Sequence, residues 1–126
     1  MLSPKATPLI SIVEDDLSVR RALRRLVQSE GYLVETHASA HDFLCSMPSA
    51  RIGCLVLDIH LDGMNGFELQ ERLASDHISI PIVFITAHDD LATRKRMRES
   101  GAAGFLIKPF DPQALLDAIH RVAGSA

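Results

Sequence analysis

Four short apolar runs of this chain each end at a side chain that could bind a metal ion or a phosphoryl group. The polar residues that follow these runs are, in chain order, Glu14-Asp15-Asp16, Asp58, Thr86 and Lys108. Buried parallel strands read as apolar runs, and open α/β sheets build their sites just beyond the carboxyl ends of such strands. The pattern therefore predicts one crevice that holds carboxylates, a hydroxyl and an amine.

Asp58 is the best candidate for the reacting group. A carboxylate is a weak nucleophile, but it can form an aspartyl-phosphate when it is held in line with a phosphoryl donor. Glu14, Asp15 and the donor's oxygens are also negative, and two unit charges about 4 Å apart repel by roughly 4 kcal/mol at an effective dielectric constant of 20. A cation must compensate, and Mg²⁺ fits because it binds oxygen ligands and commonly bridges carboxylates to a phosphate.

Lys108 and Thr86 would supply electrostatic stabilisation. The Lys108 ammonium is expected to pair with Asp58 at rest and with a phosphoryl oxygen afterwards, and the Thr86 hydroxyl is expected to donate to a phosphoryl oxygen once one arrives. Each of these residues alone is typical of an ordinary loop or helix cap. Their joint occurrence after successive strands, in this order, indicates a site.

Strand-like and helix-like segments alternate five times along the chain and would position these residues. We expect strands near 9–14, 32–37, 52–58, 80–86 and 104–107. We expect helices near 17–30, 39–47, 65–76, 89–100 and 111–122. Strict alternation implies a parallel sheet with right-handed crossovers and helices on both faces. The predicted fold class is therefore α/β, a single doubly wound domain.

Several residues support the proposed helix boundaries. Gly31 follows the first helix and Gly101 the fourth, each where a left-handed C-terminal cap is expected. Asp111 is expected to be the N-cap of the last helix, and Pro112 its first residue. The apolar residues that share one face of the first helix are Val19, Leu23, Leu26 and Val27.

Composition limits the classes of protein that this chain could be. Its 126 residues, 47% of them hydrophobic and 23% charged, are enough for one domain, expected to span 1–126 with its core at about 9–122. The net charge of −3 argues against general binding to nucleic acid or to an anionic membrane. Residues 1–6 lack the apolar stretch of a signal peptide, and no apolar run approaches the roughly 20 residues that cross a bilayer. We expect a soluble, cytoplasmic protein.

The two cysteines are too few for a disulfide framework. Cys45 and Cys54 form no C-x-x-C pair. The simplest interpretation is that both are buried free thiols in a reducing compartment.

The order and spacing of the polar residues resemble the receiver domain of bacterial two-component response regulators, from about Leu9 to Val122. The motifs that carry this resemblance are Val13-Glu14-Asp15-Asp16, Asp58 followed by Met64-Asn65-Gly66, Ile85-Thr86-Ala87 and Lys108-Pro109-Phe110. The chain is most similar to the branch of nitrogen-fixation and nodulation regulators, whose receivers precede transcriptional output domains. The resemblance implies a (βα)5 flavodoxin-like fold with a five-stranded parallel sheet of order 2-1-3-4-5.

The resemblance also assigns the metal and phosphoryl chemistry. It implies that Asp58 accepts a phosphoryl group from the phosphohistidine of a sensor histidine kinase. The implied Mg²⁺ ligands are Asp15, Asp58 and the backbone carbonyl of His60, with Glu14 contributing through water; Mn²⁺ is expected to substitute for Mg²⁺. Such a domain promotes its own phosphorylation and dephosphorylation, and is a switch rather than a turnover enzyme.

The same resemblance implies a conformational switch. Thr86 corresponds to the switch hydroxyl and Lys108 to the phosphate-pairing amine, while Phe105 corresponds to an aromatic residue that moves inward with the hydroxyl. The surface of the fourth helix and fifth strand would then control self-dimerisation or an output domain. His60 and His88 lie where family members flank the phosphoryl group, and we hypothesise that they set its lifetime.

Two departures from the family pattern bear on the site. Glu14 stands where Asp is more usual, which adds a methylene to a water-mediated contact. Leu61-Asp62 replaces the familiar Met-Pro, so the loop after Asp58 loses a rigid proline and gains a negative charge.

Two other functions compete with this interpretation. A phosphorylation-independent interaction module on the same fold would not need the complete site. An aspartate-nucleophile phosphohydrolase usually has a second acid two residues after the nucleophile, where this chain has His60. Direct DNA binding by this domain is not expected, because the sequence offers no helix-turn-helix segment.

Overall fold

The computed structural model of the protein describes residues 7–46 and 51–125, which alternate between strands and helices. The strands are β1 (Leu9–Val13), β2 (Leu33–His37), β3 (Ile52–Asp58), β4 (Ile82–Thr86) and β5 (Gly104–Ile107). The helices are α1 (Leu17–Gln28), α2 (Ala40–Cys45), α3 (Gly66–Ser75), α4 (Leu91–Glu99) and α5 (Pro112–Ala123). Every predicted element is present, with ends that differ by at most two residues. The expectation for residues 1–6, and that for the last residue of the second helix, lie outside the described residues.

All neighbouring strands pair in parallel, in the order β2-β1-β3-β4-β5, which confirms the predicted α/β fold and flavodoxin-like strand order. The register decides which residues meet beyond the carboxyl ends. Val13 pairs with Leu57, so the residue after β1 lies level with Asp58. Thr86 pairs with Ile107, so Lys108 extends just beyond it. The sheet therefore presents its polar residues along one edge.

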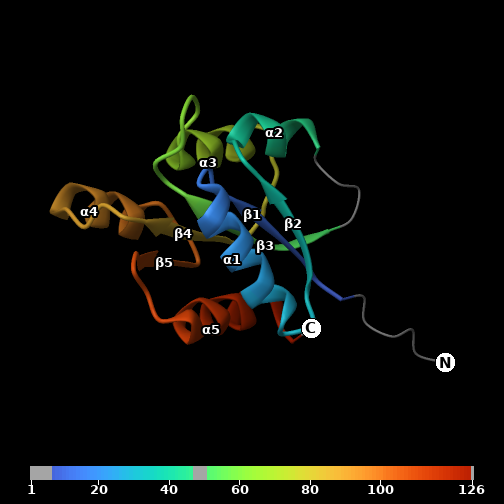
Figure 1. Ribbon diagram of the computed structural model, residues 1–126. Helices are drawn as coiled ribbons and strands as arrows, with labels where there is room; N and C mark the ends of the chain where they lie inside the picture. Colours follow the sequence, from blue (N-terminus) through green and yellow to red (C-terminus); the bar gives the residue numbers. More distant parts are fainter. Residues whose placement is uncertain (1–6, 47–50, 126) are drawn as a thin grey trace.

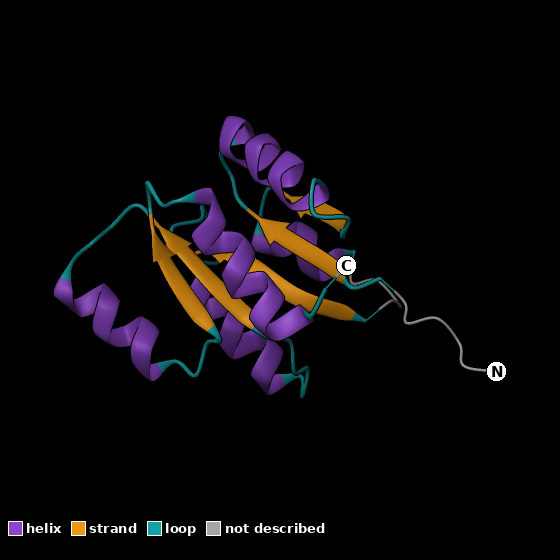
Figure 2. Ribbon diagram, turned by 90° about the horizontal axis from the view of Figure 1, so that it is seen from below, coloured by secondary structure: helices purple, strands orange, loops and turns teal. Residues whose placement is uncertain are grey.

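Alternate residues of each central strand enter two separate cores, one on each face of the sheet. One core joins the strands to α2, α3 and α4 through Phe43, Leu69, Leu73 and Met97. The other joins them to α1 and α5 through Leu23, Val27, Leu115 and Ile119. Figure 1 shows α2 and α3 above the strands and α5 below them, and Figure 2 shows the sheet enclosed between the helices. This double covering explains why the strands are apolar on both sides.

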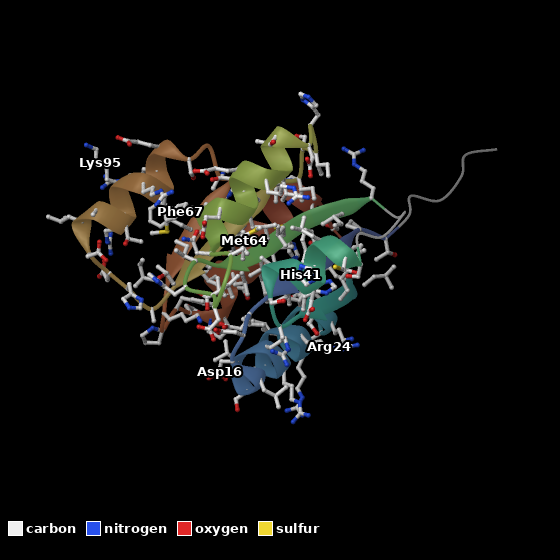
Figure 3. The ribbon with its side chains drawn as sticks, turned by 90° about the horizontal axis from the view of Figure 1, so that it is seen from above. Asp16, Arg24, His41, Met64, Phe67 and Lys95 are labelled. Atoms are coloured by element: carbon white, nitrogen blue, oxygen red, sulfur yellow. The ribbon has the colours of Figure 1, made fainter. Side chains whose placement is uncertain are left out.

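Side-chain caps fix where the helices begin. Asp16, labelled in Figure 3, accepts a hydrogen bond of 3.0 Å from the Val19 amide and starts α1 directly after the acidic residues of the first loop. Asp90 starts α4 and Asp111 starts α5 in the same way, the latter as predicted. Gly31 and Gly101 have φ values of 90° and 77°, which confirms the two left-handed caps.

The cysteine prediction is half wrong. Cys54 is buried in β3, and burial raises the pKa of its thiol to about 12. Cys45 is exposed, because it is the last residue of the short helix α2 and its Sγ lies on the outer side, 3.4 Å from His41 Nε2. Among the described residues, none of the helices is long and apolar enough to cross a bilayer.

Gly66 allows the first turn of α3 to lie against the loop that follows Asp58. A Cβ at this position would lie 2.7 Å from the Asp58 carbonyl oxygen and 2.9 Å from the Ile59 Cα. The Gly66 amide also donates a 2.9 Å hydrogen bond to the Ile59 carbonyl. The loop that follows Asp58 is thus closed by a contact that only glycine permits without movement.

We predict that Gly66→Ala lowers the free energy of unfolding by about 1–3 kcal/mol, because the new methyl group must displace backbone atoms. Urea denaturation followed by circular dichroism measures this change. Gly104→Ala is the matched control, since its Cβ would meet nothing within 4 Å. Equal losses for both variants would contradict the close-approach argument.

Candidate functional site

Three carboxylates converge beyond the carboxyl ends of β1 and β3. Oxygen atoms of Glu14, Asp15 and Asp58 all lie within 4.8 Å of one another. Glu14 and Asp58 are only 1% and 5% exposed, whereas Asp15 is exposed at the mouth of the cluster. Successive residues of the loop after β1 therefore point to different sides, one into the protein and one to solvent.

Lys108 joins the two buried carboxylates. Its Nζ lies 2.5 Å from Glu14 Oε1 and 3.3 Å from Asp58 Oδ2. The pairing with Asp58 that the sequence led us to expect is present, but Glu14 is the nearer partner. The ammonium group holds two like charges together that would otherwise repel each other in a poorly solvated place.

Three carboxylates face one ammonium group in this cluster, so negative charge is in excess. Burial raises the pKa of Glu14, and the neighbouring Asp58 carboxylate raises it further, while Lys108 acts in the opposite direction. Partial burial, together with Glu14, raises the pKa of Asp15. Burial alone would lower the pKa of Lys108, but the hydrogen bond to Glu14 and the two negative charges outweigh it and raise the pKa. An additional cation would relieve this imbalance.

The donor atoms of the cluster fit a hard divalent cation. All three side chains offer carboxylate oxygens, which are the ligands that Mg²⁺ and Mn²⁺ prefer. Asp15 is open to solvent, so a cation bound there could keep several of its waters, as Mg²⁺ usually does. The residues that are present therefore fit a magnesium ion.

Backbone amides orient the Asp58 and Thr86 side chains. The His60 amide donates a 3.0 Å hydrogen bond to Asp58 Oδ1, so each oxygen of this carboxylate has a donor. The His88 amide donates to Thr86 Oγ1 at 3.1 Å, and Thr86 is fully buried. Because this hydroxyl accepts from His88, its own hydrogen remains available to an incoming oxygen.

The imidazoles of His60 and His88 lie against each other. Their ring centroids are 3.8 Å apart with an angle of 44° between the planes, and both residues are exposed. Burial and the charge of His88 lower the pKa of His60. Phe105, the remaining predicted residue, lies on β5 and is partly buried against the core on the α3 side of the sheet.

Arg20 supports the acidic loop in a way that the sequence did not indicate. Its Nη1 donates to the backbone carbonyl of Glu14 at 2.9 Å. No sequence motif or spacing predicts this contact, because it joins a side chain of α1 to a backbone carbonyl of the preceding loop. Asn65 is different: it forms a capping box with Glu68 at the start of α3, and this pair is readable from the sequence.

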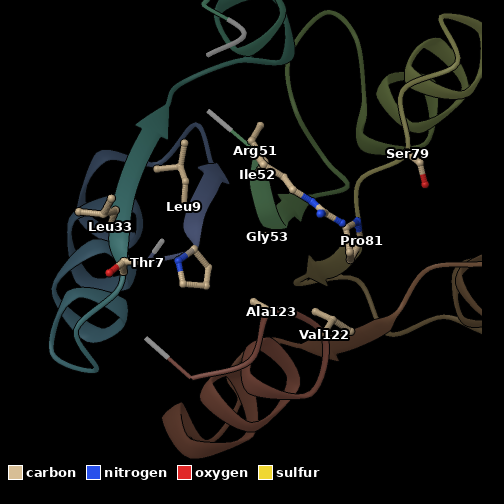
Figure 4. A pocket seen from close by; sticks show the side chains of 11 residues that line it. Thr7, Leu9, Leu33, Arg51, Ile52, Gly53, Ser79, Pro81, Val122 and Ala123 are labelled. Atoms are coloured by element: carbon tan, nitrogen blue, oxygen red, sulfur yellow. The ribbon is translucent and has the colours of Figure 1, made fainter. Parts of the chain in front are cut away.

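A separate cavity of about 580 Å³ lies at the opposite edge of the sheet (Figure 4). Its lining includes Leu9, Leu33 and Ile52, which are the first residues of β1, β2 and β3. None of the carboxylates described above borders it. The carboxylates, Thr86 and Lys108 therefore lie at the carboxyl edge, away from this cavity.

We predict that Lys108→Met lowers the free energy of unfolding by about 3 kcal/mol at neutral pH, because two buried carboxylates lose their counter-ion. Because the pKa of Glu14 is raised in the folded state, folding takes up a proton as pH falls toward the ordinary glutamate value of 4.5. The loss of unfolding free energy in Lys108→Met should therefore be smaller in mildly acidic buffer.

Urea denaturation at two pH values measures this effect. Lys95→Met is the matched control, since Lys95 lies on the outer side of α4 (Figure 3) and should change stability by less than about 0.5 kcal/mol. A Lys108→Met variant as stable as this control would show that the ion pairs contribute nothing.

Comparisons with known proteins agree on one family. A model of the response regulator receiver domain matches residues 10–120. The chain is 44% identical to nodulation protein W of Bradyrhizobium diazoefficiens over 111 residues, which cover 88% of this chain and 49% of that protein. It is 35% identical to the transcriptional regulatory protein FixJ of Rhizobium meliloti over 114 residues, which cover 90% of this chain and 56% of that protein. The chain thus spans about half the length of the curated relatives that it matches.

Solved structures give the same result. The structure of FixJ-N superposes with a TM-score of 0.85 at 34% identity, covering 94% of this chain and 95% of that one. The structure of the response regulator StyR also gives a TM-score of 0.85, at 49% identity, covering 94% of this chain and 60% of that one. The expected similarity to nitrogen-fixation and nodulation regulators is confirmed. This chain belongs to the response regulator receiver domain family of two-component systems.

Proposed function

We propose that Asp58 accepts a phosphoryl group from the phosphohistidine of a sensor histidine kinase in a Mg²⁺-dependent reaction. The chain would act as a single receiver domain with its core at about 9–122. One observation carries the proposal: a buried carboxylate, held by the His60 amide and the Lys108 ammonium, lies beside two further carboxylates. This is the arrangement that a phosphoacceptor aspartate needs.

The ligands of the metal ion follow from the same cluster. We propose Asp15, Asp58 and the His60 backbone carbonyl as direct ligands, with Glu14 acting through a water molecule. When bound, Mg²⁺ would neutralise the charge of the carboxylates and of the phosphoryl oxygens. The exposure of Asp15 supports this role, because a metal ion must enter from solvent.

The chain's own residues perform the transfer by position and charge. A carboxylate oxygen of Asp58 forms a bond to phosphorus while the bond between phosphorus and the donor's histidine nitrogen breaks. Lys108 pairs with one phosphoryl oxygen, and the free hydrogen of Thr86 donates to another. Hydrolysis reverses the modification when water attacks phosphorus, releases inorganic phosphate and restores the Asp58 carboxylate.

Phosphorylation would change the conformation of the protein at α4 and β5. Thr86 would move toward the phosphoryl group, and Phe105 would follow into the space that it leaves. This shift would change the surface of α4 and β5 and thereby control self-association or an output domain. Relatives named as transcriptional regulators support an output domain that acts on transcription.

Mass spectrometry of the intact protein tests this function. We expect incubation with acetyl phosphate and Mg²⁺ to add one phosphoryl group to the wild type and none to Asp58→Asn. Omission of Mg²⁺ should abolish the addition. An unmodified wild type that also fails to bind Mg²⁺ would favour the phosphorylation-independent module instead.

We predict that His88→Ala shortens the half-life of the aspartyl-phosphate, because the imidazole pair covers the route by which water reaches phosphorus. A shielding effect of about 1 kcal/mol corresponds to roughly a fivefold change in rate. Mass spectra taken at intervals after removal of acetyl phosphate give the half-life. His41→Ala, on the exposed side of α2, is the control. The hypothesis fails if the aspartyl-phosphates of His60→Ala and His88→Ala both decay at the wild-type rate.

A further inference from the structure

We propose that His60 and His88 form a binding site for a late first-row divalent transition metal such as Ni²⁺, Cu²⁺ or Zn²⁺. This site is distinct from the oxygen cluster of Glu14, Asp15 and Asp58. It rests on two imidazoles brought together by loops that are separated in the sequence, one after β3 and one after β4.

The two rings are close enough to reach a shared ion once they turn apart. A bond between a metal ion and an imidazole nitrogen is about 2.0–2.1 Å long, which places the centroids of two rings on one ion roughly 5 Å apart. The centroids of His60 and His88 are 3.8 Å apart, with an angle of 44° between their planes, so the rings now lie in contact. Both side chains are exposed, and rotation about their side-chain bonds would separate the rings by about 1 Å and direct one nitrogen from each toward the same ion.

The backbones that carry the rings are already held in place. The His60 amide donates to Asp58 Oδ1 at 3.0 Å, and the His88 amide donates to Thr86 Oγ1 at 3.1 Å. Both acceptor side chains are buried and anchored in the sheet. Binding would therefore order two exposed side chains without rearranging the loops, which lowers the entropic cost of forming the site.

The chemistry of the ligands separates this site from the magnesium cluster. Imidazole suits Ni²⁺, Cu²⁺ and Zn²⁺, whereas Mg²⁺ takes oxygen ligands and retains its waters. Excess Mg²⁺ should therefore leave the histidines free. The Asp90 carboxylate interacts electrostatically with His60 and so adds a negative charge near the proposed ion.

A metal ion at this position would lie beside the loops next to Asp58 and Thr86, because the His60 and His88 amides are bonded to these two side chains. A transition metal would then slow phosphorylation without displacing Mg²⁺. This consequence, unlike the binding site itself, rests on the proposed function.

Isothermal titration of Ni²⁺ into the full chain, in excess Mg²⁺, tests the site. We expect one Ni²⁺ per chain in the wild type and an affinity at least about tenfold weaker in both His60→Gln and His88→Gln. His41→Gln is the matched control, because the His41 and Cys45 side chains also bring two nitrogen and sulfur ligands together, 3.4 Å apart. Unchanged binding in the His60 and His88 variants, or its loss in His41→Gln, would overturn the proposal.

Two further measurements locate the bound ion. Ni²⁺ is paramagnetic, so in wild-type NMR spectra it should broaden the imidazole proton resonances of His60 and His88 before those of any other histidine; the reverse order would overturn the proposal. Asp15→Asn should retain Ni²⁺ binding, whereas its loss there would assign the ion to the carboxylates and also overturn the proposal.

The effect on phosphorylation is measured separately. Ni²⁺ should slow phosphoryl uptake from acetyl phosphate in the wild type but not in His88→Gln. A chain that binds Ni²⁺ through the histidines yet takes up no phosphoryl group even without Ni²⁺ would support the metal site and contradict the proposed function.

Discussion

The ion pairs that Lys108 makes with Glu14 and Asp58 hold the carboxyl edge of the sheet together. They join residues 94 and 50 positions apart in the sequence and bring together the ends of β1, β3 and β5. Two carboxylates buried side by side would be strongly unfavourable without a cation between them. The strand register, the α1 cap at Asp16 and the close approach at Gly66 all hold the loops where this pairing is possible.

The sequence was sufficient to predict the fold and which polar residues converge at the candidate site, for a physical reason. Fully buried parallel strands must be apolar on both faces, so the first polar residue after each run marks the carboxyl edge. Glu14, Asp58, Thr86 and Lys108 were found in this way, and the parallel register brings all four to one edge. Gly31 and Gly101 likewise predict the C-terminal ends of the first and fourth helices.

What the sequence could not supply depends on side-chain direction. It indicated Asp58 as the partner of Lys108, whereas the longer Glu14 side chain reaches the ammonium more closely. It suggested a buried Cys45, but that residue ends a six-residue helix whose outer side it shares with His41. The contact of Arg20 with the Glu14 carbonyl and the approach of the His60 ring to His88 depend on rotamers that no spacing specifies.

Lys108 therefore pairs with two of the carboxylates that we propose as metal ligands. Isothermal titration of Mg²⁺ into the wild type, Lys108→Met and the Lys95→Met control tests this role of the ammonium group. Removal of a positive charge beside the proposed ligands should strengthen Mg²⁺ binding by about tenfold or more in Lys108→Met and leave the control unchanged. An equal or weaker affinity in Lys108→Met would show that the ammonium group does not oppose binding of the ion to these carboxylates.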